Sequence, residues 1–588
     1  MNAKLSAPLG AQRPRVRLEQ GTYVGTKITK SNLPRAVEAF LGVPYATSER
    51  LRPAVHPPPS GETYEACEYG PACPTADPSV PADEKCLVAN IFRPVSAAAV
   101  GKPRENEAAA GGVGGGDEER KLPVLVYVHG GAFNFGRGSD RNLAAFVAHS
   151  DRGLVAVSFN YRLGPLGFLP CEVAAAEGVS NLGLLDQRAL LEWVRRNVGE
   201  FGGDAGDVTV TGFSAGAHSL GHHILSPPSR ALFNRAIVES GAATARSVLS
   251  PSHPRHASQL SHFLSQASLS NLPPSGILPA LRSLPVQTIL DASLATWADC
   301  APSVQWPFQP SIDTHSPTPV IPDLPLKTWS TPNLPPLPPL MTGFNTSEGT
   351  MFVPASSSHP SALKHFFSAL IPSLSQADLG TLDSLYPPSS SYAPPPSPRH
   401  GPEFRRLAHA YGHYGYIAPL FYSAHQASKR GAPVWLYEYA AHADLGAANH
   451  GDHVPAATRD TDVLSSRRTP GLMEVSASMH AYWSSFVTAN TPNGSANPSG
   501  VEWPRFVSPF GDDADGDRVP GPDDELGRIL VFGEGNDELM GRLGEGKRGV
   551  VARVRTLTGE EVRQFRFWWD RVVLSEGMGL AEDGGTRL

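Results

Sequence analysis

The chain lacks several features that would point to particular classes of protein. Charged residues make up only 18% of its 588 residues and the formal net charge is -7, so no basic surface for nucleic acid is expected. No apolar stretch reaches the length that a membrane span requires. The cysteines form no Cys-x-x-Cys pair and no zinc-ligand spacing. They are Cys67, Cys73, Cys86, Cys171 and Cys300.

The N-terminal segment also lacks the features of a secretion signal. Residues 1–17 contain basic side chains but no apolar core of the kind found in secretion signals. We therefore expect a cytoplasmic protein whose thiols are reduced. The expected partner is a small molecule, with no nucleic acid and no membrane span, and the sequence gives no indication of oligomeric state.

Proline and glycine, by contrast, are abundant, with 57 of each. They fall mainly between apolar runs, which predicts a regular scaffold with long irregular insertions. Between two of these runs, apolar residues from Leu185 to Val198 share one face of a helix. Strands that alternate with helices predict an α/β fold with a large, mostly parallel central sheet. The runs of strand length lie at residues 121–128, 154–159, 208–211, 236–239, 339–345 and 433–439.

We expect one large domain over residues 18–575. It would begin with a small antiparallel hairpin region near residues 21–57. Residues 1–17 and 576–588 are expected to be disordered tails. Three irregular segments are expected within the domain: a flexible insertion at 96–120, a cap-like insertion at 251–336 and a Pro/Ser-rich loop at 386–402.

One stretch organises the rest of the chain. Residues 208–217 read Val-Thr-Val-Thr-Gly-Phe-Ser-Ala-Gly-Ala, a β-branched run that breaks into Gly-x-Ser-x-Gly and continues into helix-forming residues. Such a strand, sharp turn and helix would expose the hydroxyl of Ser214, and its glycines would avoid collisions with the neighbouring strand and helix. Unpaired N–H groups at the start of that helix would favour developing negative charge. The pattern predicts a serine nucleophile for acyl transfer.

A second loop supports this hypothesis. The apolar run at 121–128 ends in His-Gly-Gly-Ala-Phe at 129–133, and glycines after a central strand allow backbone N–H groups to point into a cavity. A plain tight turn would give the same pattern in isolation. Beside a serine nucleophile the glycines favour an oxyanion hole, because acyl transfer needs backbone donors from a second loop.

A serine nucleophile needs a base, and the base needs an acid that orients it. In α/β-hydrolases the acid and then the histidine follow the serine in the chain, and both lie at the carboxyl ends of strands. Glu348 and His450 each follow a predicted strand in that order. Two neighbouring histidines, His442 and His453, compete with His450 for the role of base.

Many blocks of the sequence together resemble the type B carboxylesterase and cholinesterase-like serine hydrolases, in particular intracellular fungal members. The resemblance spans residues 21–569. It includes Asn-Tyr-Arg-Leu-Gly-Pro-Leu-Gly-Phe at 160–168, Asn-Leu-Gly-Leu-Leu-Asp-Gln-Arg at 181–188, Gly-Phe-Ser-Ala-Gly at 212–216, Phe-Asn-Arg-Ala-Ile-Val-Glu-Ser-Gly at 233–241 and Tyr-Trp-Ser-Ser-Phe-Val-Thr at 482–488. The resemblance implies an α/β-hydrolase fold with helical and loop insertions over the active site.

The resemblance also implies roles for individual residues. Ser214 would be the nucleophile, Glu348 the acid and His450 the base of a two-step acyl transfer. No metal or organic cofactor is implied. The backbone N–H groups of the oxyanion hole would be those of Gly131, Ala132 and Ala215.

The resemblance to the family also implies which residues line the substrate pocket. Its aromatic residues would be Phe133, Phe213, Trp306 and Phe308. Trp306 and Phe308 fall near the block that lines the acyl pocket of relatives, so we expect them to limit acyl chain size. A pair of core aromatics beside prolines would explain these two residues equally well.

The chain departs from the family pattern at several positions. Phe213 stands where the family often has Glu before the nucleophile, so the site loses a negative charge that would attract cationic substrates. His453 stands where relatives often carry an acid. Cys73 and Cys86 match the family's first disulfide, although reducing conditions would keep the pair open. The short interval between these cysteines resembles neither a choline-binding loop nor a lipase lid, which disfavours an interfacially activated lipase.

Together these patterns predict a serine carboxylesterase that hydrolyses uncharged, short- to medium-chain carboxylic esters through an acyl-enzyme intermediate. Two alternatives stay open. An enzyme of the same fold could cleave amide, lactone or carbamate bonds in specialised metabolism. A catalytically silent cholinesterase-like scaffold is the other alternative, but such relatives usually lose the serine, and here all three triad positions are present.

Overall fold

The computed structural model describes residues 13–576, apart from residues 76, 78, 96–120, 246–247, 333, 465–468, 495–496, 522–523 and 541–544. The expected flexible insertion at 96–120, the first twelve residues and the end of the chain from 577 lie outside the described residues. None of the described helices is both long and apolar enough to cross a membrane.

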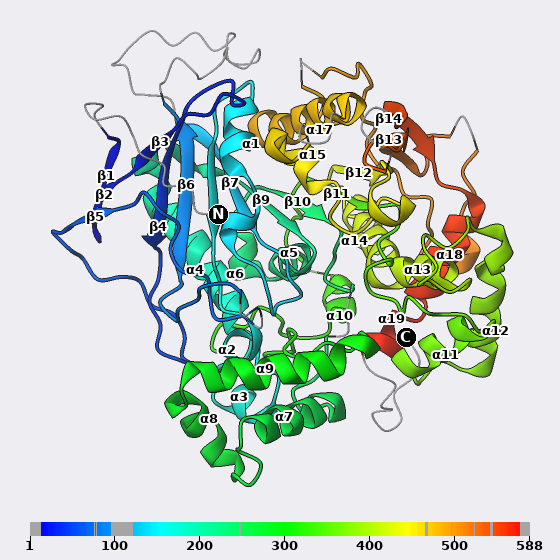
Figure 1. Ribbon diagram of the computed structural model, residues 1–588, viewed down its shortest axis with the longest axis horizontal. Helices are drawn as coiled ribbons and strands as arrows, with labels where there is room; N and C mark the ends of the chain where they lie inside the picture. Colours follow the sequence, from blue (N-terminus) through cyan, green and yellow to red (C-terminus); the bar gives the residue numbers. More distant parts are fainter. Residues whose placement is uncertain are drawn as a thin grey trace.

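The described strands form two sheets (Figure 1). The smaller has the order β1-β2-β5, and the larger has eleven strands in the order β14-β13-β12-β11-β10-β9-β7-β8-β6-β4-β3. The strands of the smaller sheet are β1 (Arg15–Leu18), β2 (Gly21–Val24) and β5 (Thr63–Glu65). Those of the larger are β3 (Thr26–Ile28), β4 (Val37–Pro44), β6 (Val88–Pro94), β7 (Leu122–Val128), β8 (Val155–Phe159), β9 (Gly203–Phe213), β10 (Arg235–Glu239), β11 (Leu340–Asn345), β12 (Val434–Tyr439), β13 (Arg528–Asn536) and β14 (Arg548–Thr556).

The middle of the larger sheet is parallel and its edges are antiparallel. Neighbouring strands run parallel from β8 through β7, β9, β10, β11 and β12 to β13. β14 pairs antiparallel with β13 at one edge, and β6, β4 and β3 continue antiparallel from β8 at the other. Because consecutive parallel strands end on the same side, the loops after β7, β9, β11 and β12 meet at one edge of the sheet.

Both faces of the central strands are buried, which explains their nearly continuous apolar sequences. Along β7, Val124, Val126 and Val128 belong to the core on one face, whereas Leu125 and Tyr127 belong to the core on the other. Buried strands of this kind must be covered by helices on both sides. The sequence periodicity of two therefore divides one strand between two hydrophobic cores.

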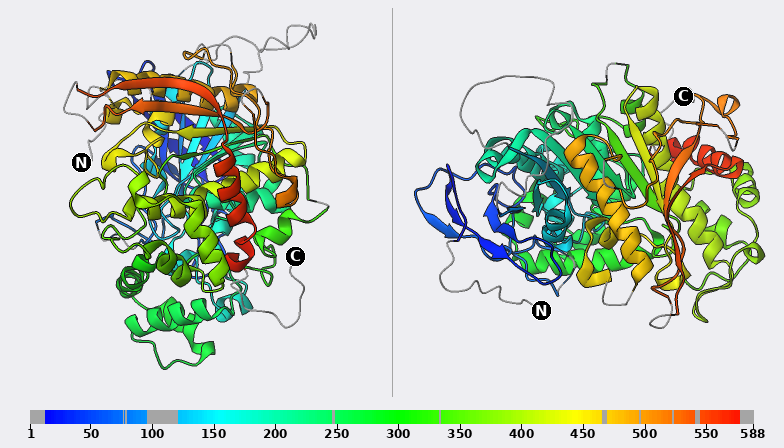
Figure 2. Two further views of the ribbon diagram at one scale, coloured as in Figure 1. Left: turned by 90° about the vertical axis from the view of Figure 1, so that its right-hand side faces the viewer. Right: turned by 90° about the horizontal axis from the view of Figure 1, so that it is seen from above.

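Helices supply that cover on each face (Figures 1 and 2). The first face is covered by α4 (Leu182–Asn197), α5 (Ala215–Leu225) and α14 (Ala418–Lys429), with α18 (Gly559–Trp569) packed against α14. The second face is covered by α1 (Leu143–His149), α15 (Val454–Thr458) and α17 (Pro470–Ala489). Pro470 at the first turn of α17 and Asn490 in a left-handed conformation after it mark where that helix begins and ends.

Helices occupy much of the segment at 251–336. It contains α7 (Pro254–Gln266), α8 (Pro274–Ser283), α9 (Val286–Cys300) and α10 (Pro325–Trp329). Figure 1 shows α7, α8 and α9 grouped at the lower edge of the molecule. Further helices follow β11, namely α11 (Ala362–Leu370), α12 (Gln376–Leu385), α13 (Phe404–Gly412) and a π-helical turn (His413–Ile417) that continues into α14.

The structure adds elements that the sequence patterns do not predict. The hairpin of β13 and β14 forms a long ribbon at the sheet edge (orange in Figure 2). β13 contains Gly533 and Gly535 at φ of 72° and 71°, and β14 is largely exposed, so neither reads as a continuous apolar strand. β1 begins at Arg15, within the segment that was expected to be a tail.

A disulfide joins Cys73 to Cys86 just before β6. Both cysteines are buried in the larger hydrophobic core. The remaining cysteines, Cys67, Cys171 and Cys300, are free. The bond closes a short loop, which restricts the unfolded chain more than the folded one.

We expect the double variant Cys73→Ala/Cys86→Ala to lose about 3 kcal/mol of unfolding free energy, because a loop of this length costs that much chain entropy when it is closed. Urea unfolding followed by circular dichroism measures the change. Cys300→Ala, at a half-buried free cysteine, is the matched control. If a reducing agent left the unfolding midpoint of the unaltered protein unchanged, this disulfide would have no part in its stability.

Candidate active site

Ser214 occupies a strained turn between β9 and α5. Its backbone has φ 56° and ψ -122°, a conformation that side-chain-bearing residues rarely adopt. Two glycines make the turn possible, because an added Cβ on Gly216 would lie 2.1 Å from the carbonyl oxygen of Val128 and one on Gly212 would lie 2.7 Å from the carbonyl carbon of Gly216. The Gly-x-Ser-x-Gly pattern therefore reflects close backbone contact between β7, β9 and α5.

The loop after β7 lies against this turn. An added Cβ on Gly130 would be 3.1 Å from the Cβ of Ser214. The next three residues, Gly131, Ala132 and Phe133, all have positive φ, at 107°, 53° and 62°. Two of them are not glycine, so the fold holds this loop in a costly conformation beside the serine.

Side-chain amides fix the orientation of that loop. The carbonyl oxygen of Ala132 accepts hydrogen bonds from Asn134 Nδ2 at 2.8 Å and from Gln309 Nε2 at 2.9 Å. Within the described part of the chain, no hydrogen bond is donated by the backbone N–H groups of Gly131, Ala132 or Ala215. Free, fixed donors on two sides of a serine are what a developing oxyanion requires.

Glu348 and His450 come together from the loops after β11 and β12. The two loops are tied by a hydrogen bond from Ser347 N to the carbonyl oxygen of Ala448 at 2.9 Å. His450 Nδ1 then lies 2.5 Å from Glu348 Oε2. The Glu348 side chain is fully buried, and that of His450 is nearly so.

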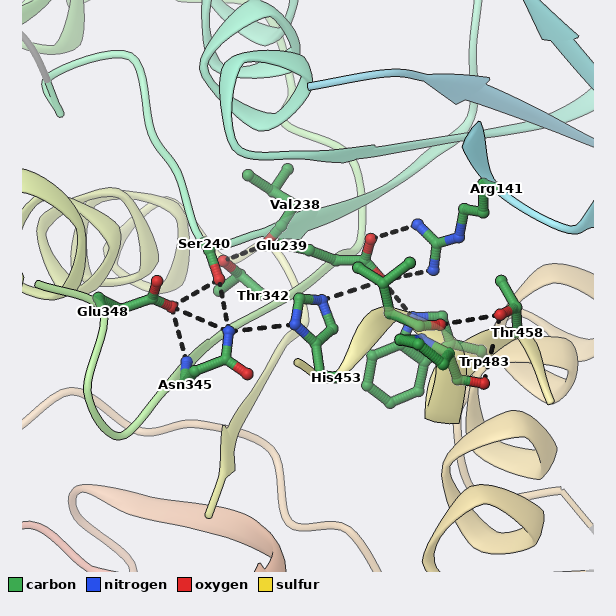
Figure 3. Close-up of polar contacts among 12 residues, drawn as sticks. Arg141, Val238, Glu239, Ser240, Thr342, Asn345, Glu348, His453, Thr458 and Trp483 are labelled. Atoms are coloured by element: carbon green, nitrogen blue, oxygen red, sulfur yellow. Dashed lines mark hydrogen bonds and ion pairs between the residues drawn. The ribbon is translucent and has the colours of Figure 1, made fainter. Parts of the chain in front are cut away.

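The second oxygen of Glu348 is held as firmly as the first (Figure 3). Oε1 accepts hydrogen bonds from Ser240 Oγ at 2.6 Å, from Asn345 N at 2.7 Å and from Asn345 Nδ2 at 3.2 Å. Burial alone would raise the pKa of this carboxyl, but the charge interaction with His450 and the hydrogen bonds outweigh it and keep the pKa below its usual range. Glu348 is therefore an anion at neutral pH.

An anionic Glu348 fixes the tautomer of His450. Its Nδ1 must carry the proton that Glu348 accepts, which leaves Nε2 as a lone-pair acceptor. This Nε2 makes no hydrogen bond to any residue that the structure describes, so the hydroxyl of Ser214 is not yet bonded to it. Such contacts are often long before substrate binds and tighten in the complex.

Aromatic rings surround the His450 imidazole. Phe213 lies 4.6 Å away, Tyr416 4.5 Å and Phe352 5.2 Å, measured between ring centroids. Trp306 in turn lies 5.4 Å from Phe352. Apolar rings thus form much of the wall around the imidazole, which lowers the local dielectric and strengthens the charge interactions there.

The four aromatic residues expected in the substrate pocket do not all lie beside His450. Phe213 contacts His450 directly, and Trp306 is linked to it through Phe352. Phe133 is buried and faces Phe168 at 4.9 Å. Phe308 is also buried and packs against Phe263 of α7 at 5.2 Å, which is the position of a core aromatic.

Sequence reasoning names neither Phe352 nor Tyr416, and it gives Ser240 no role. Tyr416 reaches His450 from the π-helical turn, an element common near functional sites that has no simple sequence signal. Ser240 lies in the Glu-Ser-Gly block at the end of β10, so the block itself was a usable signal.

His453 belongs to a separate buried network (Figure 3). Its Nδ1 accepts a hydrogen bond from Asn345 Nδ2 at 3.1 Å, and its Nε2 faces Glu239 Oε1 at 3.9 Å. Glu239 is itself bound by Arg141 at 2.5 and 3.0 Å and by Trp483 Nε1 at 2.7 Å. His442, the other rival to His450, is exposed.

The His453 ring is neutral. Burial lowers the pKa of His453 to about 4, and although the carboxylates of Glu239 and Glu348 raise it, Arg141 and His450 oppose them. Because Nδ1 accepts a hydrogen bond, the proton is on Nε2 and points toward Glu239. The contact of 3.9 Å is therefore not an ion pair.

A neutral buried His453 predicts a pH-dependent stability difference. The folded-state pKa of about 4 lies below the unfolded value near 6.5. The unfolded chain therefore gains a proton that the folded chain cannot bind, and the histidine loses stabilising effect as the pH falls from 6.5 toward 4. Since Gln does not titrate, the stability gap between the wild type and His453→Gln should shrink by about 2 kcal/mol between pH 8 and pH 5.

Urea unfolding of both proteins at pH 8, 6 and 5 measures this gap. Gln can keep one acceptor toward Asn345 and one donor toward Glu239, so both proteins should fold. A gap that stays constant over this range would mean that His453 binds its proton equally well in the folded and unfolded chains.

No group of three or more His, Cys, Asp or Glu side chains arranged to hold a metal ion occurs among the residues that the structure describes.

Comparison with known proteins gives relatives over most of the chain. The chain is 31% identical to Secreted lipase 4 of Gibberella zeae over 507 residues, which cover 84% of this chain and 86% of the relative. It is 28% identical to the Para-nitrobenzyl esterase of Bacillus subtilis, over 81% of this chain and 90% of the relative. A solved structure of a PNB esterase superposes with a TM-score of 0.70 at 26% identity and covers 94% of this chain and 100% of that one.

These relatives correct one expectation. The sequence patterns led us to expect a cytoplasmic protein, and this is contradicted by the similarity to a secreted lipase over most of the chain. The disulfide between Cys73 and Cys86 also differs from the expectation of reduced thiols, because such bonds form mainly in oxidising compartments. The lack of an apolar core in residues 1–17 was therefore not a sufficient basis for assigning a compartment.

A model of the carboxylesterase family matches residues 12–514. That match covers most of the chain and includes the serine turn, the loop after β7 and both loops that carry Glu348 and His450. The chain therefore belongs to the carboxylesterase family.

Proposed function

We propose that Ser214, Glu348 and His450 are the catalytic residues with which this serine carboxylic ester hydrolase works. The observation that carries the proposal is the 2.5 Å contact between His450 Nδ1 and Glu348 Oε2. The contact is made by loops at the carboxyl ends of neighbouring strands. The ring of Phe213, the residue before Ser214, lies 4.6 Å from the His450 ring, so the nucleophile and the base share one site.

Acylation is the first step of the proposed reaction. His450 Nε2 takes the proton of the Ser214 hydroxyl, and the serine oxygen attacks the ester carbonyl carbon. Glu348 stabilises the imidazolium that forms. When the tetrahedral intermediate collapses, His450 gives its proton to the departing alcohol, and the acyl group stays on Ser214.

Deacylation repeats the chemistry with water. His450 removes a proton from a water molecule, the resulting hydroxide attacks the acyl carbon, and the serine oxygen leaves with the proton from the imidazolium. In both steps the negative charge on the carbonyl oxygen would be bound by the backbone N–H groups of Gly131, Ala132 and Ala215. Because these donors are fixed before substrate arrives, they cost no reorganisation in the transition state.

The proposed substrates are carboxylic esters without a positive charge, with short to medium acyl chains. Phe213 presents an apolar ring beside His450 where a carboxylate would attract cations. Trp306 and Phe352 narrow the same space. This wall supports a limit on acyl length, with Trp306 as the residue that sets it.

Triad variants test the proposed roles. Ser214→Ala and His450→Ala should each lose at least about 10⁴-fold in kcat for 4-nitrophenyl butyrate, because nucleophile and base act as a unit. Glu348→Gln should lose about 10³- to 10⁴-fold in kcat, since the amide no longer holds His450 in the tautomer that leaves Nε2 free to accept a proton. His442→Ala, at an exposed histidine of the same loop, should stay within twofold of the unaltered protein.

A fluorophosphonate probe gives an independent readout, because it should label the unaltered protein and not Ser214→Ala. Hydrolysis that survived in His450→Ala but disappeared in His453→Gln would reassign the base. Labelling of Ser214→Ala at full rate would remove Ser214 from the mechanism.

Trp306 should control acyl length. We expect Trp306→Ala to raise the ratio of kcat/KM for 4-nitrophenyl octanoate over butyrate by about tenfold, since removing one wall of an apolar pocket changes discrimination by one or two methylene equivalents. Trp306→Phe keeps an aromatic wall and should leave the ratio near its original value. An unchanged profile in Trp306→Ala would show that another residue limits the chain.

A further inference from the structure

A cavity that contains an arginine lies next to the aromatic residues around His450. The cavity has a volume of about 510 Å³, part of it open to solvent, and lies between α7, the segment around Trp306 and the helix that carries Tyr411. Arg255, in the first turn of α7, lines this cavity together with Tyr414 and Gln309.

This cavity adjoins the proposed catalytic residues on two sides. Gln309 lines it and also donates the 2.9 Å hydrogen bond to the carbonyl oxygen of Ala132 in the oxyanion loop. Trp306 lines it and contacts Phe352, which lies 5.2 Å from His450. Tyr411, also in the lining, contacts Phe352 at 5.9 Å. The cavity therefore shares residues with the walls of the ester site.

The guanidinium of Arg255 has no counter-ion among the residues that the structure describes. Within this part of the chain the guanidinium forms no hydrogen bond, ion pair or cation–π contact. The hydrogen bond of 3.0 Å to His253 Nδ1 comes from the backbone N–H of Arg255. Among the described residues that line the cavity none is Asp or Glu. Burial lowers the pKa of Arg255, and the nearby titratable group that opposes this shift is the phenol of Tyr414, which is neutral at physiological pH.

Such an arrangement is costly for the free protein. Arginine remains charged at any physiological pH, and a half-buried charge without a partner is destabilising. A cation in the first turn of a helix is also unfavourable, because the helix dipole makes that end positive. The first turn of α7 carries no acidic residue to compensate. An anion beside Arg255 would relieve both effects.

We propose that Arg255 binds a carboxylate carried by the substrate, so that esters bearing a free carboxylate are a preferred substrate class. The proposal rests on the proposed function, since it assigns this cavity to the substrate of Ser214. The carboxylate would stand at the far end of either the acyl chain or the alcohol, with the ester carbonyl at the serine. A charge-assisted hydrogen bond in a half-buried site is worth enough to change specificity by about tenfold or more.

The test compares matched anionic and neutral esters by pH-stat. Monoethyl adipate against ethyl hexanoate places the carboxylate on the acyl side, and 6-acetoxyhexanoate against hexyl acetate places it on the alcohol side. Monoethyl succinate and suberate extend the acyl series to shorter and longer reach. The quantity of interest is the anionic-to-neutral ratio of kcat/KM in each arm.

We expect Arg255→Gln to lower this ratio by about tenfold in one arm, mainly through KM, while kcat/KM for the neutral ester changes less than twofold. Arg255→Lys should retain part of the preference, because the charge remains but the bidentate fork is lost. Arg399→Gln, at an exposed arginine outside the cavity, is the matched control and should change no ratio. Added salt should weaken the preference of the unaltered protein and leave Arg255→Gln unaffected.

The arm in which the ratio falls identifies the side of the ester that carries the carboxylate. A ratio that is equal in the unaltered protein and Arg255→Gln in both arms would overturn the proposal. An equal fall in Arg399→Gln would do the same, because it would assign the preference to overall charge. Ser214→Ala, assayed beside these variants with the neutral esters, separates a failure of the proposed triad from a failure of the arginine.

Discussion

The carboxylate of Glu348 is fully buried, so the segments around it must supply hydrogen-bond donors. A charge without water needs hydrogen bonds to both of its oxygens, and here the donors come from the ends of three strands: Ser240 after β10, Asn345 at the end of β11 and His450 in the loop after β12. Asn345 is close to Glu348 in the chain, but Ser240 and His450 come from distant segments, so the full set of donors exists only when the parallel strands are assembled. The same requirement orients His450 and leaves its Nε2 free to accept a proton. Function and folding thus depend on one set of contacts.

Two buried ion pairs show the same need for partners from other segments, in sequence blocks that contribute no residue to the proposed triad. Arg162 binds Asp186 at 2.6 and 2.7 Å, which joins the block at 160–168 to the helix at 181–188. Arg141 binds Glu239, and Trp483 of α17 donates to the same carboxylate. Replacing such pairs with apolar residues is not always destabilising, but removing one partner is. These contacts tie together sequence blocks that lie far from Ser214 in the chain.

Much of this arrangement could be predicted from sequence because its signals are local. Gly212 and Gly216 mark the serine turn, and the continuous apolar runs of β7 and β8 mark a sheet covered on both faces. The rest depends on meetings between distant segments. Phe352, Tyr416 and Arg255 approach the site from three separate insertions, and no spacing in the sequence relates them to Ser214 or His450. β13 and β14 escape a pattern search because positive-φ glycines and an exposed face interrupt their alternation.

The charged groups near the ester site differ in whether a partner of opposite charge lies beside them. Glu239 is neutralised by Arg141, and His453 is neutral because burial lowers its pKa to about 4. Phe213 adds no charge beside the imidazole. Two further charges near the ester site are the Glu348 anion behind His450 and the Arg255 cation in the adjoining cavity. In the proposed mechanism the anion faces the ring that becomes positive, whereas the cation lines the cavity to which we assign part of the substrate. A cationic substrate would meet Arg255 without a carboxylate to offset it, and an anionic one would supply the missing partner. On these two proposals, Glu348 serves the base and Arg255 selects the ester.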